Sequence, residues 1–120
     1  MRIILADNRR KVRFALRALL TQQTGLEVLG EVADVQELLP LVETACPDAL
    51  LLDWELPGMD ISDLLVDLRQ LCPDMIVVAL SGRVDARRAA LAAGVDAFVS
   101  KGDPPERLLS AIHSCTRSSA

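Results

Sequence analysis

Apolar residues follow one another along this chain in two patterns that alternate. The first pattern is a short, unbroken apolar run, such as residues 3–6, which stops at Asp7. The second is a longer stretch in which apolar residues recur every three or four positions, the spacing of one helix face. The two patterns predict five strands, each followed by a helix. The strands are expected at residues 3–6, 27–32, 49–52, 75–80 and 97–100.

Polar and special residues mark the ends of the predicted helices. Asp34 followed by Glu37 is a capping box, which predicts a helix that continues to about residue 45. Gly94 ends the helix that begins near residue 84, because glycine tolerates the left-handed conformation found at helix C-termini. The segment 103–106 begins the last helix, which is expected to reach about Ser114. These signals place the helix ends independently of the apolar spacing.

Strands that are apolar on both faces belong inside a parallel sheet that helices cover on both sides. Right-handed crossover connections then predict an α/β fold, a five-stranded, doubly wound parallel sheet. The chain has 120 residues, which is the size of one domain with its own core. We expect this domain to cover residues 1–115, with residues 116–120 as a polar tail or linker stub.

The composition excludes several classes of protein. Hydrophobic residues make up 51% of the chain and the net charge is −4, which is not the composition of a disordered protein. An acidic chain with 2% aromatic residues lacks the basic surface and stacking rings of a nucleic-acid binder. No apolar run is long enough for a membrane span or a signal peptide. A cytoplasmic protein without membrane contact is therefore expected.

The chain contains three cysteines, Cys46, Cys72 and Cys115, none of which forms a C-x-x-C pair with another. The only histidine near any of them is His113. An odd number of widely spaced cysteines predicts reduced thiols in a cytosolic protein, not a disulfide framework or a zinc site.

Polar side chains come directly after four of the predicted strands. They are Asp7 with Asn8, Asp53, Ser81 and Lys101. Ligands of an open α/β sheet bind at the carboxyl ends of its strands, so these side chains are expected to converge. Oxygen ligands of this kind suit Mg²⁺, and a lysine beside a hydroxyl suits the oxygens of a phosphoryl group. The sequence therefore predicts a site for a divalent cation and a phosphoryl group.

This set of residues, in this order, resembles the receiver domain of two-component response regulators. The resemblance extends from Ile3 to about Ile112 and includes the segments DWELPG at 53–58 and AAGVDAFVSK at 92–101. The second segment, together with residues 6–20, is most similar to receivers of the NarL/LuxR class. The family implies the flavodoxin-like strand order 2-1-3-4-5, with helices on both faces of the sheet.

The resemblance implies a role for each matching residue. Asp53 is the expected phosphoacceptor, which takes a phosphoryl group from a sensor histidine kinase. Ser81 and Lys101 are expected to bind that group, and the Ser81 hydroxyl to move towards it. Phe98 occupies the position of an aromatic switch, whose burial follows the movement of the hydroxyl.

The resemblance also implies a Mg²⁺ cofactor. Its expected ligands are the side chains of Asp7, Asn8 and Asp53 and the backbone carbonyl of Glu55. A domain of this family is not an enzyme, although it assists its own phosphorylation and dephosphorylation. The NarL/LuxR pattern implies control of transcription through a DNA-binding module outside this chain, and it leaves a homodimer open.

One residue departs from the family pattern. Most receivers have a second aspartate, a direct Mg²⁺ ligand, where this chain has Asn8, and an amide lacks the negative charge. Weaker Mg²⁺ binding is expected, unless Arg9, Arg10 or Lys11 reaches the site and replaces part of the cation. The alternative function is a phosphorylation-independent, receiver-like interaction module. A nucleotide-binding domain is disfavoured because no glycine-rich loop follows the first strand.

Charge is unevenly distributed along the chain. Residues 18–68 contain no lysine or arginine, whereas the first predicted helix is basic and carries Arg13 and Arg17. Such a helix is either a solvated surface or a surface that attracts a kinase or a second copy of the domain.

Overall fold

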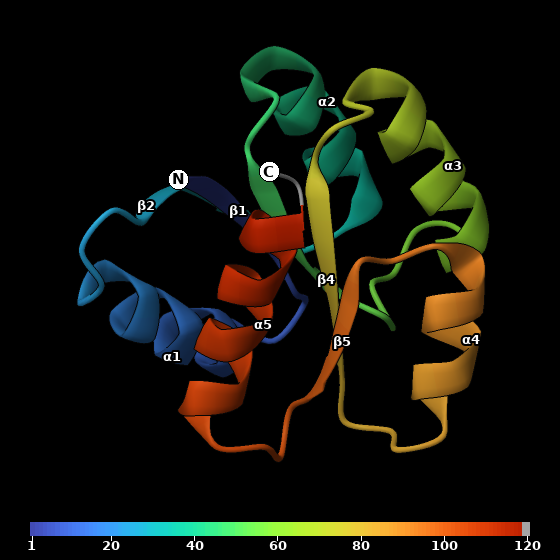
Figure 1. Cartoon of the computed structure of the whole chain (residues 1–120). Helices are drawn as coiled ribbons and strands as arrows, with labels where there is room; N and C mark the ends of the chain where they lie inside the picture. Colours follow the sequence, from blue (N-terminus) through green and yellow to red (C-terminus); the bar gives the residue numbers. More distant parts are fainter. Residues whose placement is uncertain (119–120) are drawn as a thin grey trace.

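Five parallel strands form a central sheet, and five helices cover its two faces (Figure 1). The computed structural model describes residues 1–118. The strands are β1 (Arg2–Ala6), β2 (Glu27–Val32), β3 (Ala49–Asp53), β4 (Ile76–Ser81) and β5 (Ala97–Ser100). The helices are α1 (Arg10–Thr21), α2 (Val35–Ala45), α3 (Ile61–Leu71), α4 (Ala86–Ala93) and α5 (Pro105–Ser118). No helix in this part of the chain is long and apolar enough to cross a membrane.

The strand order is β2-β1-β3-β4-β5, and all neighbouring strands are parallel. Helices α1 and α5 lie on one face of the sheet, and α2, α3 and α4 lie on the other (Figure 1). The predicted doubly wound α/β fold of flavodoxin-like order is therefore confirmed. The winding reverses between β1 and β3, and such a reversal is where open α/β sheets form their binding sites.

Successive residues of each central strand face opposite sides of the sheet, and both sides are buried. In β1, Ile3 and Leu5 belong to the core under α1 and α5, whereas Ile4 and Ala6 belong to the core under α2, α3 and α4. Every residue of β3 is buried. The unbroken apolar runs in the sequence are thus the strands with a layer of helices on each face.

The helix ends follow the predicted caps, with two boundaries shifted. Asp34 caps α2 through its Oδ1 atom, which accepts a hydrogen bond from the Glu37 N–H at 2.9 Å. Helix α4 begins at Ala86, not near residue 84, and ends at Gly94, whose φ is 106°. Helix α5 continues to Ser118, so residues 116–118 of the expected polar tail are helical. Residues 119–120 of that tail lie outside the described residues, and the domain boundary at residue 115 stays a prediction.

The expectation of three reduced cysteines is wrong for two of them. Cys46 and Cys72 form a disulfide, with 5.9 Å between their Cα atoms, and the buried Cys115 lies outside it. The two bonded cysteines follow the last residues of α2 and α3, which pack on the same face of the sheet. Their separation of 26 residues does not reveal this proximity, because it arises only when the two helices pack side by side.

Candidate functional site

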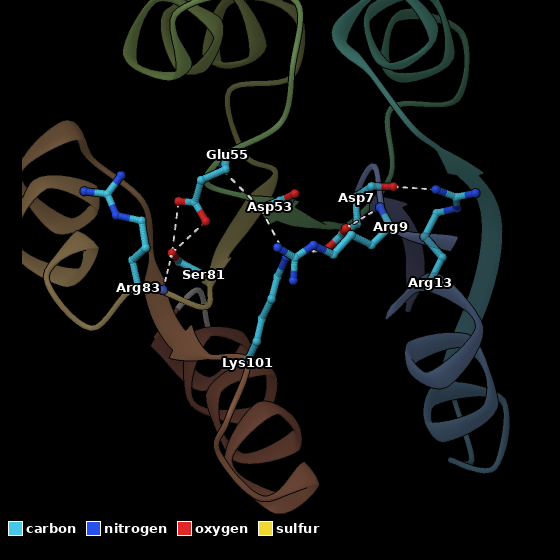
Figure 2. A network of polar contacts seen from close by, with 8 residues as sticks. All are labelled: Asp7, Arg9, Arg13, Asp53, Glu55, Ser81, Arg83 and Lys101. Carbon is cyan, nitrogen blue, oxygen red and sulfur yellow. Dashed lines mark hydrogen bonds and ion pairs between the residues drawn. The ribbon is translucent and has the colours of Figure 1, made fainter. Parts of the chain in front are cut away.

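Four of the predicted site residues meet at the carboxyl edge of the sheet (Figure 2). Asp7 follows β1, Asp53 ends β3, Ser81 ends β4, and Lys101 follows β5. These are four adjacent strands that run in the same direction, so their ends lie side by side. The structure thus places together side chains that are far apart in the sequence.

Lys101 lies between the two aspartates. Its Nζ atom is 2.8 Å from Asp7 Oδ2 and 3.2 Å from Asp53 Oδ1. Asp7 and Asp53 are only 1% and 2% exposed. Two carboxylates repel each other strongly away from water, and an ammonium group between them offsets that repulsion. The lysine is therefore the group that allows two buried carboxylates to share this site.

The carboxylate of Asp7 is oriented by the segment that follows it. Its Oδ1 atom accepts a hydrogen bond from the Arg9 N–H at 2.8 Å. The Asp7 backbone carbonyl accepts a second hydrogen bond from Arg13 Nη1 at 2.6 Å. The Nε atom of Arg13 is 3.5 Å from a carboxylate oxygen of Glu31 in β2. These contacts hold the turn between β1 and α1 and direct Asp7 Oδ2 towards Lys101.

The two oxygens of the Asp53 carboxylate have different surroundings. Oδ1 accepts a hydrogen bond from the Glu55 N–H at 3.0 Å and is also the oxygen near Lys101. The next residue, Trp54, is buried, and its N–H donates to the Leu80 carbonyl in β4 at 2.8 Å. The backbone that follows the carboxylate is therefore held, and Oδ1 is the oxygen that the protein engages.

Ser81 is fully buried, and its hydroxyl hydrogen-bonds to the side chain of Glu55. The Ser81 Oγ atom is 2.9 Å from each of the two Glu55 carboxylate oxygens. It also accepts a hydrogen bond from the Arg83 N–H at 3.0 Å, which is the cap-like role that its place before α4 suggests. Figure 2 shows the Glu55 side chain reaching from the end of β3 across to Ser81. The hydroxyl therefore has an anionic partner in this structure.

One oxygen of the site has the properties of a cation ligand. Asp7 Oδ2 is buried and accepts no hydrogen bond within the described residues, although it lies against the Lys101 ammonium. No group of three or more His, Cys, Asp and Glu side chains that could hold a metal occurs in residues 1–118. A cation here would use the two carboxylates with Asn8, the Glu55 carbonyl and water, an incomplete protein shell that Mg²⁺ accepts. The residues present therefore fit Mg²⁺.

The two residues after Asp7 are exposed. In Figure 2 the side chain of Arg9 points towards Lys101 and the two aspartates. Figure 2 draws neither Arg10 nor Lys11, so the expectation that one of these three basic residues replaces part of the cation stays a prediction.

Phe98 is buried in β5, within the core under α2, α3 and α4. The guanidinium carbon of Arg87 in α4 is 6.0 Å from the centre of its ring, a cation–π distance. Phe98 is paired with Ala79, which lies two residues before Ser81 in β4. Two residues further along this pair of strands, Ser81 is paired with Ser100.

Two contributions to the site were not anticipated from the sequence. Glu55 was expected to contribute its backbone carbonyl, and its side chain contacts Ser81. The sequence places Arg13 on a basic helix face, whereas in the structure its side chain donates to the backbone carbonyl of Asp7. The sequence contains one signal for the first contact, since an acid two residues after Asp53 lies close to the same strand edge.

Comparisons with known proteins agree on the family. The family model described as response regulator receiver domain matches residues 3–113. An uncharacterised transcriptional regulatory protein of Bacillus subtilis (strain 168), YhcZ, is 34% identical over 111 residues, covering 91% of this chain and 52% of YhcZ. The nitrate/nitrite response regulator NarL of Escherichia coli (strain K12) is 31% identical over 113 residues, covering 92% of this chain and 52% of NarL. The chain thus spans about half the length of these curated relatives.

Solved structures show the same similarity. A LuxR-family response regulator from Aurantimonas sp. SI85-9A1 aligns with a TM-score of 0.88 and 28% identity, covering 98% of this chain and 85% of that chain. A CheY-like receiver domain from Methanospirillum hungatei JF-1 aligns with a TM-score of 0.85 and 27% identity, covering 98% and 94%. The similarity to NarL/LuxR receivers that the sequence predicts is confirmed. The chain belongs to the response regulator receiver domain family.

Proposed function

We propose that this chain is a phosphoacceptor domain in which a sensor histidine kinase phosphorylates Asp53 in a Mg²⁺-dependent reaction. The observation that carries the proposal is the Lys101 ammonium held between two buried aspartates. A carboxylate beside a fixed cation, at the carboxyl end of a parallel sheet, is suited to accept a phosphoryl group. The domain would act as a signalling switch, and not as an enzyme with a turnover substrate.

Asp53 Oδ2 is the proposed nucleophile. The N–H of Glu55 and the ammonium of Lys101 both engage Oδ1, which orients the carboxylate for attack through the other oxygen. As the new O–P bond forms, the P–N bond of a phosphohistidine breaks and its electron pair returns to the imidazole nitrogen. The product is an acyl phosphate on Asp53.

Positive charge near Asp53 would stabilise the phosphoryl oxygens. Asp7, Asn8, Asp53 and the Glu55 carbonyl would hold Mg²⁺, which would neutralise part of the charge on these oxygens. The ammonium of Lys101, 3.2 Å from Asp53 Oδ1, is in place to bind another of them. Lysine and serine would together replace water around the new group.

On phosphorylation, the Ser81 hydroxyl is proposed to give up its hydrogen bond to Glu55 and to donate to the phosphoryl group instead. Both acceptors are anionic and compete for one donor, and a phosphoryl group adds up to two negative charges. A shift of Ser81 would reach the Phe98 ring through the pairing of β4 with β5. This is the proposed route from the site to an altered interaction face.

The proposed output is control of transcription. The relatives are named as a transcriptional regulatory protein and a nitrate/nitrite response regulator, and the chain matches 52% of each. DNA would be bound by a separate effector module and not by this acidic domain. We place this signalling in the cytoplasm, with a second copy of the domain as a further partner of the phosphorylated form.

Phosphorylation by acetyl phosphate tests the proposal. With Mg²⁺ present, the intact mass is expected to rise by one phosphoryl group, and the gain should be absent in Asp53→Asn and after chelation of Mg²⁺. Trp54, which follows Asp53 and is 8% exposed, provides a second readout. Its fluorescence is expected to respond to Mg²⁺ and to beryllofluoride in the wild type, and much less in Asp53→Asn.

A phosphorylation-independent interaction module is the second candidate function. The observation that favours it is Asn8, which stands where most receivers have a second acid. No mass gain at saturating Mg²⁺ and phosphodonor would contradict phosphorylation and leave this candidate. Asn8→Asp is the informative variant in that case, because a gain in Asn8→Asp alone would identify the missing carboxylate as the cause.

A further inference from the structure

The tripeptide Cys-Pro-Asp occurs twice, at Cys46–Asp48 and at Cys72–Asp74. The first copy connects α2 to β3, and the second connects α3 to β4. Because β3 and β4 are parallel neighbours, with Ala49 paired to Ile76, equivalent positions just before them lie side by side. The repeat therefore brings its two cysteines together at the edge of the sheet opposite Asp53, where they form the disulfide. Only the packing of β3 beside β4 turns this repeat into a bonded pair.

Cys46 has a backbone conformation that usually selects a different residue. Its φ is 39° and its ψ is 72°, and it is the only non-glycine residue with a positive φ in the described part of the chain. Glycine is preferred at such a helix end because a Cβ atom is unfavourable in the left-handed region. A glycine at position 46 would suit this backbone conformation but would not form the disulfide with Cys72.

The two sulfur-bearing residues differ in access to solvent. Cys46 is exposed, whereas Cys72 is only 2% exposed. Both line a surface hollow of about 420 Å³, together with Pro47, Asp48 and Pro73. A small thiol or disulfide can therefore reach the bond from the side of Cys46.

The disulfide joins two helices that also meet at their other ends. The Val35 N–H at the start of α2 donates to the Pro57 carbonyl at 3.1 Å, in the loop between Asp53 and α3. The same loop packs against Val35 and Gln36 at Gly58. The helices α2 and α3 are thus tied at one end by the loop that follows Asp53 and at the other end by the disulfide.

We propose that Cys46 and Cys72 form a reversible thiol–disulfide pair, which small-molecule thiols and disulfides open and close through the exposed Cys46, and whose closed form clamps α2 to α3. This site is separate from the proposed phosphoacceptor and does not depend on it. It lies at the opposite edge of the sheet and uses different residues.

The exchange is balanced with a small-molecule disulfide as the oxidant. The Cys46 thiolate attacks one sulfur of that disulfide, whose S–S bond breaks and releases one thiolate. The Cys72 thiolate then attacks the Cys46 sulfur of the mixed disulfide and releases the second thiolate. The two protons lost by the cysteines are taken up by the two released thiolates. Reduction by two equivalents of a small thiol reverses both steps.

Trapping the mixed disulfide tests the entry point of the reaction. Oxidised glutathione is added to reduced Cys72→Ser and to reduced Cys46→Ser, and the adducts are followed by intact mass. Cys46 in Cys72→Ser is expected to react on the order of tenfold faster, or more, than Cys72 in Cys46→Ser. Equal rates, or a faster reaction of Cys72, would overturn the proposal.

Cys115 provides the internal control in both variants. Burial, and to a lesser extent the Asp96 carboxylate, raises the pKa of the Cys115 thiol, which keeps it protonated and slow to react. Cys115→Ala added to each variant removes any remaining adduct at that position. The difference between Cys46 and Cys72 is expected to survive in these double variants.

A titration of the wild-type chain in glutathione buffers tests reversibility without relying on any variant. Alkylation under denaturing conditions is expected to label one cysteine in the oxidised form and three in the reduced form, with a single transition between them. Hydrogen exchange in the reduced form is expected to rise more at the ends of α2 and α3 than in α1 and α5, where it changes only as far as the global stability falls. A bond that never forms, a bond that never opens, or an equal rise in exchange in all five helices would each overturn the proposal.

Discussion

The Glu55 carboxylate holds the hydroxyl that a phosphoryl group on Asp53 would need. Ser81 Oγ is buried and lies 2.9 Å from both Glu55 oxygens. A buried polar group that loses its partner costs about 1–3 kcal/mol, so this contact stabilises the arrangement found here. Glu55 also brings a negative charge close to the position of a phosphoryl group. At the scale of single residues, Glu55 is therefore expected to oppose activation.

Replacing Glu55 tests this role. Glu55→Ala is expected to bind beryllofluoride more tightly, because Ser81 loses a competing acceptor; about 1 kcal/mol corresponds to a roughly fivefold lower Kd. The measurement is a titration of Trp54 fluorescence at constant Mg²⁺. Glu55→Gln, which keeps an acceptor without the charge, should give an intermediate affinity. Glu43→Ala, which removes an exposed acid of α2, is the matched control and should leave the affinity for beryllofluoride unchanged. If Glu55→Ala also leaves this affinity unchanged, Glu55 does not oppose activation.

At the scale of elements, the loop between β3 and α3 connects the site to the helix layer. Gly58 in this loop has a φ of 116°. A Cβ atom at Gly58 would lie 2.9 Å from the Gln36 side-chain oxygen and 3.1 Å from the Val35 Cβ. Glycine thus allows the loop that follows Asp53 to contact the start of α2.

Gly58→Ala is expected to lower the free energy of unfolding by about 1–3 kcal/mol, through backbone strain and the close contact with Val35. Denaturant unfolding followed by Trp54 fluorescence measures the change. Gly82→Ala is the control, because a Cβ atom there has nothing within 4 Å, and its effect should stay within about 0.5 kcal/mol. Similar losses in both variants would contradict a specific role for the Gly58 contact.

At the scale of the whole molecule, the sheet separates two cores that share no side chains. The core under α2, α3 and α4 is cross-linked by the disulfide, whereas the core under α1 and α5 depends on packing. A cross-link stabilises a fold mainly by restricting the unfolded chain, and more so for a longer loop. The bond between Cys46 and Cys72 should therefore affect global stability as well as the local clamp.

Cys46→Ser is expected to lower the free energy of unfolding by about 3.5 kcal/mol under oxidising conditions, for a loop closed between cysteines 26 positions apart. With an excess of a small thiol, the wild type and the variant should unfold at similar denaturant concentrations. Cys115→Ser keeps the disulfide, so its difference in stability from the wild type should be the same with and without the thiol. A loss in Cys46→Ser that is equally large in both conditions would assign the effect to the serine and not to the cross-link.

Local rules in the sequence predict most of the fold. The apolar runs mark the central strands β1, β3 and β4 within one or two residues because burial on both faces leaves no polar positions inside them. Asp34 marks a helix start because its side chain accepts a hydrogen bond from a backbone N–H of the first turn. Gly94 marks a helix end because it adopts the left-handed backbone conformation there. The start of α4 and the end of α5 were misplaced, since tertiary packing decides how far a helix continues past its last strong signal.

The order of elements and the residues at the strand ends were enough, by themselves, to predict the parallel sheet and the convergence of Asp7, Asp53, Ser81 and Lys101, whereas the family came from the resemblance of these motifs to known receivers. The sheet and the convergence follow from local periodicity and from the rule that parallel strands end at one edge. Only the tertiary structure decided which atoms meet: Lys101 between two carboxylates, Glu55 on Ser81, and Cys46 bonded to Cys72. Such contacts depend on side-chain direction and on the packing of helices distant in sequence, which no local pattern encodes.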